Sequence, residues 1–178
     1  MKGFALVLAG IAITVVTWGM YGPVLHKGQM AMGGSRLRPL ICVGLAYFAI
    51  AIVVPGILLA LRGEKGSWTA MGTLWSMGGG AAGALGALGI IIAFNFGGKP
   101  DYVMPLVFGL APVVNAFLTL YMNNTWKDFT PFSLSVFMAG LILVAVGAFT
   151  VLFIVPKSHA PSPGAHAART ATHAKIGS

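Results

Sequence analysis

Five aromatic or polar side chains stand in otherwise apolar stretches and could contact a solute: Trp18, Tyr21, His26, Asn115 and Tyr121. The first three lie within about three helical turns of one another, next to a bend expected at Pro23. Aromatic surface beside an imidazole and the neighbouring Lys27 suits an anionic or sugar-like solute. An interfacial aromatic belt, with Lys27 extending to lipid headgroups, explains the same residues without a solute.

Asn115 lies in a stretch whose prolines interrupt backbone hydrogen bonding. Pro105 and Pro112 flank Gly109, and a proline inside a helix removes one amide donor. Carbonyl groups freed in this way, beside an amide side chain, can coordinate a polar solute, and discontinuous helices mark many transporter sites. Ordinary kinked helices are common in membranes too, so both interpretations stay open for Asn115.

The chain offers little to an enzyme. Its three carboxylates, Glu64, Asp101 and Asp128, lie in loops or at helix ends, where they cannot form an intramembrane proton relay. A haem or copper site needs paired histidines, yet only His26 precedes the C-terminal tail. No nucleophile and base stand at a catalytic spacing. We therefore expect no enzymatic activity, no cofactor and no metal site.

The elements that must position these side chains are membrane helices. The chain is 57% apolar and 8% charged, with a mean hydropathy of +0.89. Its apolar runs approach the roughly 20 residues that cross a bilayer, and they lack the alternation of barrel strands. The sequence predicts an all-α transmembrane bundle of about five helices in one domain, residues 1–157. The expected helices cover about 4–29, 39–61, 68–96, 102–122 and 131–155, with kinks in the first and fourth.

The third predicted helix, 68–96, is rich in Gly and Ala. Small residues recur at a spacing of four in two ladders, Gly72, Ser76, Gly80 and Ala84, and Gly79, Gly83 and Ala87. Such ladders permit close approach by a neighbouring helix. Small residues on more than one face also leave room for a substrate.

The net charge of +8 is concentrated near helix ends and in the tail, residues 158–178, which is predicted to be disordered and basic. We ascribe this charge to anionic lipid headgroups and not to nucleic acid. Its distribution favours a cytoplasmic C-terminus and an external N-terminus. The location expected is a bacterial inner membrane. The single Cys42 cannot form an intrachain disulfide.

Several short motifs together resemble one half of a drug/metabolite transporter superfamily protein, the group that includes EamA-type exporters and sugar porters. They are Trp18-Gly19 in the first helix, the Gly/Ala-rich helix, the stretch PLVFGLAPVVNAFLTLYM, and FSLSVFMAGLILVAVGAF after a polar link. The link reads NNTWKDFT, where family repeats often carry Gly-Glu. The external N-terminus also departs from the family's usual topology.

Full-length members of that family have two five-helix repeats, so the resemblance implies a homodimer or a pairing with a sister chain. It implies a half-size transporter subunit that moves a small metabolite by alternating access. The alternative is a non-transporting accessory or scaffold subunit of a larger membrane complex, for which the small-residue helix supplies contacts.

Overall fold

The structure, a computed structural model, describes residues 2–155, and these residues are helical apart from short connections. Its elements are α1 (Lys2–Ala31), α2 (Leu37–Phe48), the π-helix η1 (Ala49–Val53), α3 (Val54–Arg62), α4 (Ala70–Asn95), α5 (Pro100–Asn123), the 3₁₀ helix η2 (Thr125–Asp128) and α6 (Pro131–Ile154). Since α2, η1 and α3 follow one another without a break, five spans are long and apolar enough to cross a membrane. The prediction of a five-helix transmembrane bundle is confirmed. The predicted disordered tail lies outside the described residues.

Local sequence signals set several helix boundaries. The hydroxyl of Thr69 accepts a hydrogen bond from the Gly72 amide at 3.2 Å and caps α4, and Thr130 caps α6 through Ser133 in the same way. Proline occupies the first turn of α5 and of α6, where its missing amide costs nothing. The chain leaves the α4 end through Gly97, whose φ of +90° is strained for other residues.

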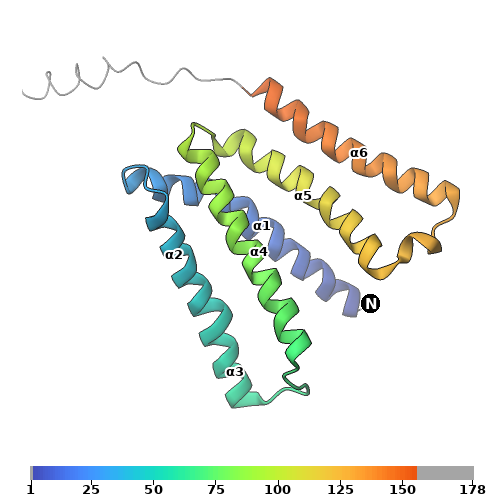
Figure 1. Ribbon diagram of the computed structural model, residues 1–178, viewed down its shortest axis with the longest axis horizontal. Helices are drawn as coiled ribbons and strands as arrows, with labels where there is room; N and C mark the ends of the chain where they lie inside the picture. Colours follow the sequence, from blue (N-terminus) through green and yellow to red (C-terminus); the bar gives the residue numbers. More distant parts are fainter. Residues whose placement is uncertain (1, 156–178) are drawn as a thin grey trace, which may run out of the picture.

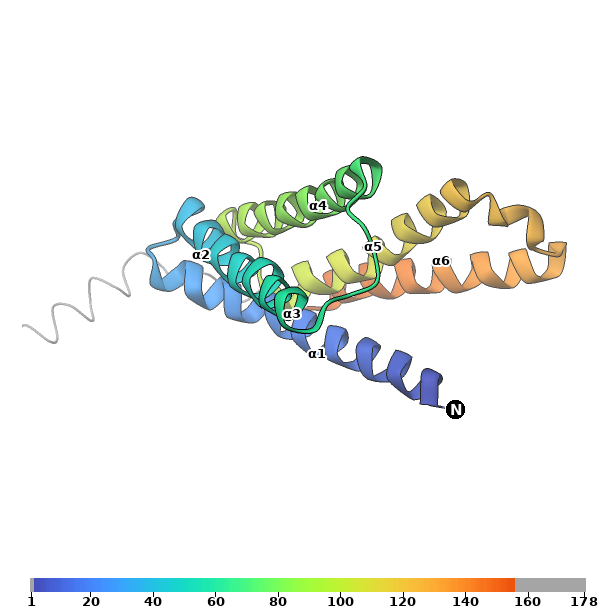
Figure 2. The same cartoon turned by 90° about the horizontal axis from the view of Figure 1, so that it is seen from below.

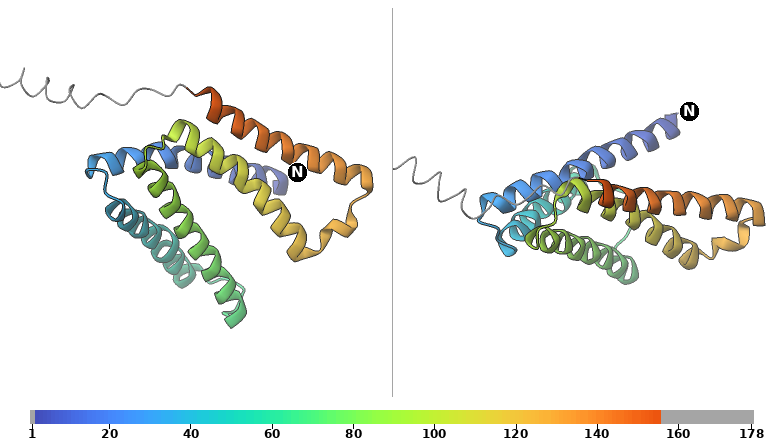
Figure 3. Two further views of the ribbon diagram at one scale, coloured as in Figure 1. Left: turned by 45° about the horizontal axis from the view of Figure 1, so that its top comes forward. Right: turned by 90° about the horizontal axis from the view of Figure 1, so that it is seen from above.

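The spans converge at one end of the bundle and separate toward the other (Figure 1). We call the convergent end, formed by the connections 32–36 and 96–99, the joined end. The opposite end, formed by the connections 63–69 and 124–130, is the splayed end. The ribbons of α3 and α4 diverge toward the connection 63–69, and those of α5 and α6 lie side by side toward the joined end and diverge toward the connection 124–130 (Figures 2 and 3).

The buried core lies at the joined end. It consists of Leu25 from α1, Ile90, Ile91 and Phe94 from α4, and Val103 and Met104 from α5. A methyl group at Gly22 would overlap the Met104 side chain, so this glycine allows α1 and α5 to approach each other closely. The α5–α6 hairpin has a similar close contact, because Gly109 lies against Ala148. Elsewhere the helices expose large apolar side chains, as expected where lipid is the solvent.

Two features were not expected from the sequence. A π-helical segment lies in the second span, just before Pro55, while α1 and α5 stay helical through Pro23, Pro105 and Pro112. The glycines of the predicted small-residue ladders of α4 are not covered by a neighbouring helix, although Ala87 at the joined end is buried. At Gly79, Gly80 and Gly83, no atom of the described residues outside α4 lies within 4 Å of an added methyl position.

Candidate functional site

Three polar side chains of α1 enter the joined end. Tyr21, Leu25 and Gln29 are spaced by four residues and therefore share one face of the helix, and His26 lies on the adjoining strip. Each polar residue of this set, Tyr21, His26 and Gln29, has a buried atom without a hydrogen-bond partner in the described structure. We call these three residues the α1 polar set.

Gln29 is the most deeply buried member, with 1% of its surface exposed. Its Nε2 donates a hydrogen bond to the carbonyl of Ile91 on α4 at 3.2 Å. This bond fixes which way the amide points, so that Oε1 is held as a buried acceptor with no donor. An unpaired buried polar atom costs about 1–3 kcal/mol. A group that brought a hydrogen-bond donor to this oxygen would remove that cost.

His26 is half-buried, one turn before Gln29. The edge of one ring meets the face of the other between His26 and Phe94, with 4.9 Å between centroids and an interplanar angle of 70°. The packing holds the imidazole while Nδ1 stays buried and unpaired. A neutral imidazole has one donor and one acceptor nitrogen, so this ring can complement either kind of group on a ligand.

Tyr21 lies two helical turns before Gln29, and its hydroxyl is also buried without a partner. Its side chain lines a cavity of about 270 Å³ between α1 and α2, together with Thr17, Met20, Val24, Leu25 and Val43. The lining is largely apolar. Tyr21 therefore lines an apolar space with its ring, while its hydroxyl group, able to donate and accept, is buried without a partner.

The other predicted site residues lie outside this set. Trp18 is 56% exposed and stacks on Phe108 of α5, with centroids 6.1 Å apart and the planes 20° from parallel. Asn115 and Tyr121 lie on the second half of α5 and are exposed, Tyr121 to 74%. Of the five predicted residues, the structure thus brings Tyr21 and His26 into the core and leaves the others on helix surfaces of the single chain.

A network of side chains closes the joined end. With its amide oriented so that both atoms have partners, Asn95 donates to the carbonyl of Gly34 at 2.7 Å and accepts from Arg36 Nε at 3.3 Å. The Arg36 guanidinium also lies 5.5 Å from the centroid of the Phe96 ring, a cation–π distance. The Tyr102 hydroxyl donates to the carbonyl of Gly97 at 3.1 Å. The connections that leave α1 and α4 are therefore tied to each other.

Sequence reasoning missed Gln29 and the structural role of Asn95. Gln29 ends the first apolar run and Asn95 ends the third, and amides in such places are usually interfacial. The available signal was spacing, because Gln29 follows Tyr21 by eight residues and so continues its helix face.

The joined end is also basic. Lys27, Arg36, Arg38 and Lys99 all lie at the end of α1, the start of α2 or the start of α5. Within residues 2–155, no group of three His, Cys, Asp or Glu side chains is placed to hold a metal ion. The α1 polar set contains no carboxylate, lysine or arginine, so it suits a neutral, hydrogen-bonding ligand.

Comparison of the chain with models of protein families, with curated proteins and with solved structures found no match. Function must therefore be argued from the site. Over the described residues the chain is an integral membrane protein with five candidate spans.

Proposed function

We propose that this chain is one subunit of a small-solute transporter, completed by a second five-helix chain, most simply another copy of itself. The observation that carries the proposal is the α1 polar set, whose three unpaired polar atoms lie buried in an apolar bundle. Buried polar groups without partners are costly, and membrane proteins keep them where a substrate or a pathway needs them. The solute expected is a small neutral metabolite with hydroxyl groups, such as a sugar.

Pairing explains the rest of the geometry. A single chain leaves its spans separated at the splayed end and leaves Trp18, Asn115 and Tyr121 on helix surfaces. A second subunit would cover those side chains and close the transport path, as the resemblance to two-repeat transporters implies. Alternating access would then move the paired bundles around a shared site.

The orientation proposed places the joined end in the cytoplasm of a bacterial cell. The basic residues Lys27, Arg36, Arg38 and Lys99 favour that side under the positive-inside rule. The end of α6 lies toward the joined end in Figure 1, so the C-terminus would be cytoplasmic.

The direct test is flux into proteoliposomes, measured with a panel of radiolabelled neutral hexoses. Gln29→Leu should abolish the flux of the transported sugar, because the variant removes the buried acceptor while keeping an apolar helix face. The matched control is Met30→Leu, since Met30 is the next residue and is 61% exposed. Equal flux in Gln29→Leu and the native chain, with both folded, would contradict the proposal.

The second candidate is the accessory or scaffold subunit. It is favoured by the uncovered small-residue face of α4. No neighbouring atom in the described part of the chain lies within 4 Å of a methyl position added at Gly79, Gly80 or Gly83, so a helix of another protein could pack closely there. A scaffold predicts stable co-purification with an unrelated membrane protein and no effect of Gln29→Leu on that association.

A further inference from the structure

The second membrane span changes its hydrogen-bonding pattern halfway along. In α2 the Ala49 amide donates to the carbonyl of Leu45, four residues back, as in an ordinary α-helix. At the end of η1 the Val54 amide donates instead to Ala49, five residues back. The π-helical segment Ala49–Val53 thus holds one more residue per turn than the helices on either side.

Pro55 explains why the change occurs there. Proline has no amide hydrogen, and its ring collides with the carbonyl four residues earlier in an α-helix. The carbonyl of Ile50 would accept a hydrogen bond from the amide of residue 54 in an α-helix, or of residue 55 in a π-helix. The Val54 amide donates to the Ala49 carbonyl instead, and Pro55 has no amide hydrogen. The backbone at η1 therefore lacks a regular hydrogen bond in the middle of a membrane span, and bending there breaks fewer bonds than elsewhere.

The two halves of the span are anchored very differently. In α2, Pro39 is buried, and Leu40 and Val43 pack against the core cluster of the joined end. In α3 no residue is buried. The chain leaves α3 through Gly63, whose φ is +61°, and continues as an extended connection to α4. One half is therefore fixed to the bundle, and the other is held only through η1 and this connection.

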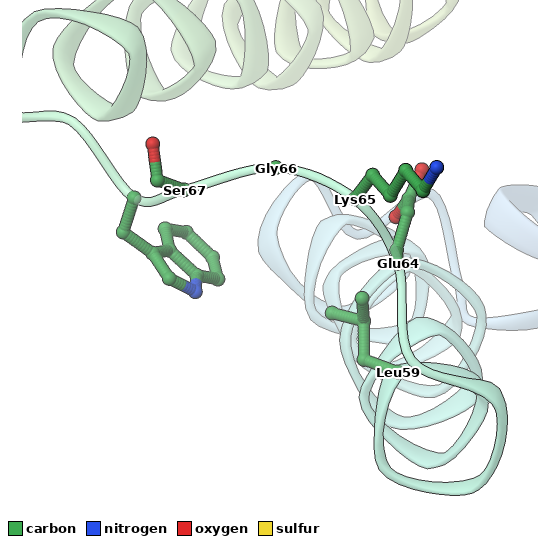
Figure 4. Close-up of a pocket in the computed structure, with 6 residues that line it drawn as sticks. Leu59, Glu64, Lys65, Gly66 and Ser67 are labelled. Carbon is green, nitrogen blue, oxygen red and sulfur yellow. The ribbon is translucent and has the colours of Figure 1, made fainter.

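Open space lies next to the hinge segment and at the far end of α3. A cavity of about 640 Å³ lies between η1 and the first half of α4. It is lined by Ala51 and Ile52 of η1, by Ser67–Thr69 of the connection, and by Gly72, Thr73, Ser76, Met77 and Gly80 of α4. A second hollow, of about 380 Å³, lies between Leu59 of α3 and the connection Glu64–Trp68 (Figure 4). The small residues of α4 leave room for a helix to move in without a clash.

We propose that η1 is a hinge and that α3 is a lid, which swings about η1 to close the 640 Å³ cavity against the small-residue face of α4. The four observations that meet here are the π-helical segment, Pro55, the unanchored α3 and the cavity between η1 and α4. The hinge does not depend on the proposed transport function, because an accessory subunit could use the same movement to admit or release a partner helix. In either case α2 stays fixed while α3 moves.

The test is a pair of distance distributions measured by pulsed electron paramagnetic resonance on the full chain in nanodiscs, in a Cys42→Ala background. One spin-label pair, at Leu61 and Met71, reports α3 against α4. The control pair, at Ile41 and Leu85, reports α2 against the same helix. All four side chains are exposed, so labels should not disturb packing. The lid should give a Leu61–Met71 distribution with two maxima, or about twice as wide as the Ile41–Leu85 distribution.

The variant Pro55→Ala tests whether Pro55 is the cause of the hinge at η1. The variant restores an amide donor, and since α3 buries nothing, the span can become a continuous α-helix. The Leu61–Met71 distribution should then narrow to a single maximum. Pro112→Ala is the matched control, because Pro112 lies inside α5 without a π-helical segment, and it should leave that distribution unchanged. A narrow native Leu61–Met71 distribution, or one that Pro55→Ala does not narrow, would overturn the hinge.

Hydrogen exchange of the native chain keeps the proposal testable if Pro55→Ala fails to fold. Amides of residues 56–62 should exchange about 10-fold faster than those of residues 40–48. Equal protection of the two halves of the span would overturn the proposal.

Discussion

The joined and splayed ends of this bundle are built from the same apolar helices, yet the buried core lies at the joined end. At the joined end, large side chains such as Ile91 and Phe94 meet, and Gln29 and Asn95 tie the elements together through hydrogen bonds. At the splayed end, α4 offers glycine and serine, and α3 buries nothing. In lipid, apolar surface alone does not drive helices together, so side-chain fit and interhelical hydrogen bonds decide where they meet.

The largest expected effect is the loss of a core side chain at the joined end. Ile91 is fully buried, and Ile91→Ala should destabilise the fold by about 2 kcal/mol, the lower limit for such substitutions. The lower limit applies because the unfolded helices stay in lipid, so the cavity dominates the cost. Unfolding by denaturant in detergent micelles measures the change. Leu85→Ala, on the same helix but 68% exposed, should cost far less, and equal costs would remove the contrast between the ends.

Glycine substitutions should sharpen the contrast further. Gly22→Ala places a methyl group into the Met104 side chain and should destabilise by about 1 kcal/mol, the lower end for overpacking, because the atoms it meets belong to a flexible side chain. Gly80→Ala meets open space and should be neutral or stabilising by up to about 1 kcal/mol, because alanine favours helix. Thermal unfolding of the two variants in the same detergent compares them. If the unfolding temperatures of the two variants shifted by similar amounts in the same direction, the packing described for the two glycines would be contradicted.

Replacing the side-chain amides of Asn95 and Asn115 should change the free energy of unfolding less. Asn95→Leu removes the ties to Gly34 and Arg36 and should cost about 1 kcal/mol. Asn115→Leu should leave stability unchanged, because Asn115 is exposed in the single chain. If Asn115 contacts solute in the paired transporter, the same variant should lose flux in proteoliposomes. Loss of stability in Asn115→Leu with intact flux would argue against both expectations.

Gln29→Leu should also have a small effect on stability. The variant loses the hydrogen bond to the Ile91 carbonyl, worth about 0.6 kcal/mol on average between membrane helices, and it also removes the unpaired Oε1. The two changes oppose each other, so the free energy of unfolding should move by less than about 1 kcal/mol. Denaturant unfolding beside the flux assay separates a binding role from a structural one. A large destabilisation would show that Gln29 acts mainly through its hydrogen bond to α4 and would argue against a role in binding solute.

The spans could be predicted from the sequence, because bilayer thickness and hydropathy determine how long an apolar helix must be. The expected run 131–155, for example, corresponds to Pro131–Ile154 in the structure. Lateral packing could not be predicted in the same way. Hydropathy treats Ile91 and Leu85 alike, although one is buried and the other faces outward. The buried role of Gln29 depends on where α4 crosses α1, which no local pattern contains.

The prolines show the same limit. Pro23, Pro105 and Pro112 marked the helices expected to be irregular, yet the π-helical segment lies before Pro55. Whether a proline bends a helix or shifts its hydrogen bonds depends on what holds each side. The unanchored α3 can take up an extra residue, whereas α1 and α5 are held by the core around Gly22 and Met104.

The proposed function is tested most directly by native mass spectrometry of the gently solubilised protein. The account predicts a dimer of the 18.4 kDa chain, or a pair with a sister chain of five helices, because one bundle leaves its transport path open. A single copy bound within an unrelated membrane complex would contradict it and would favour the scaffold.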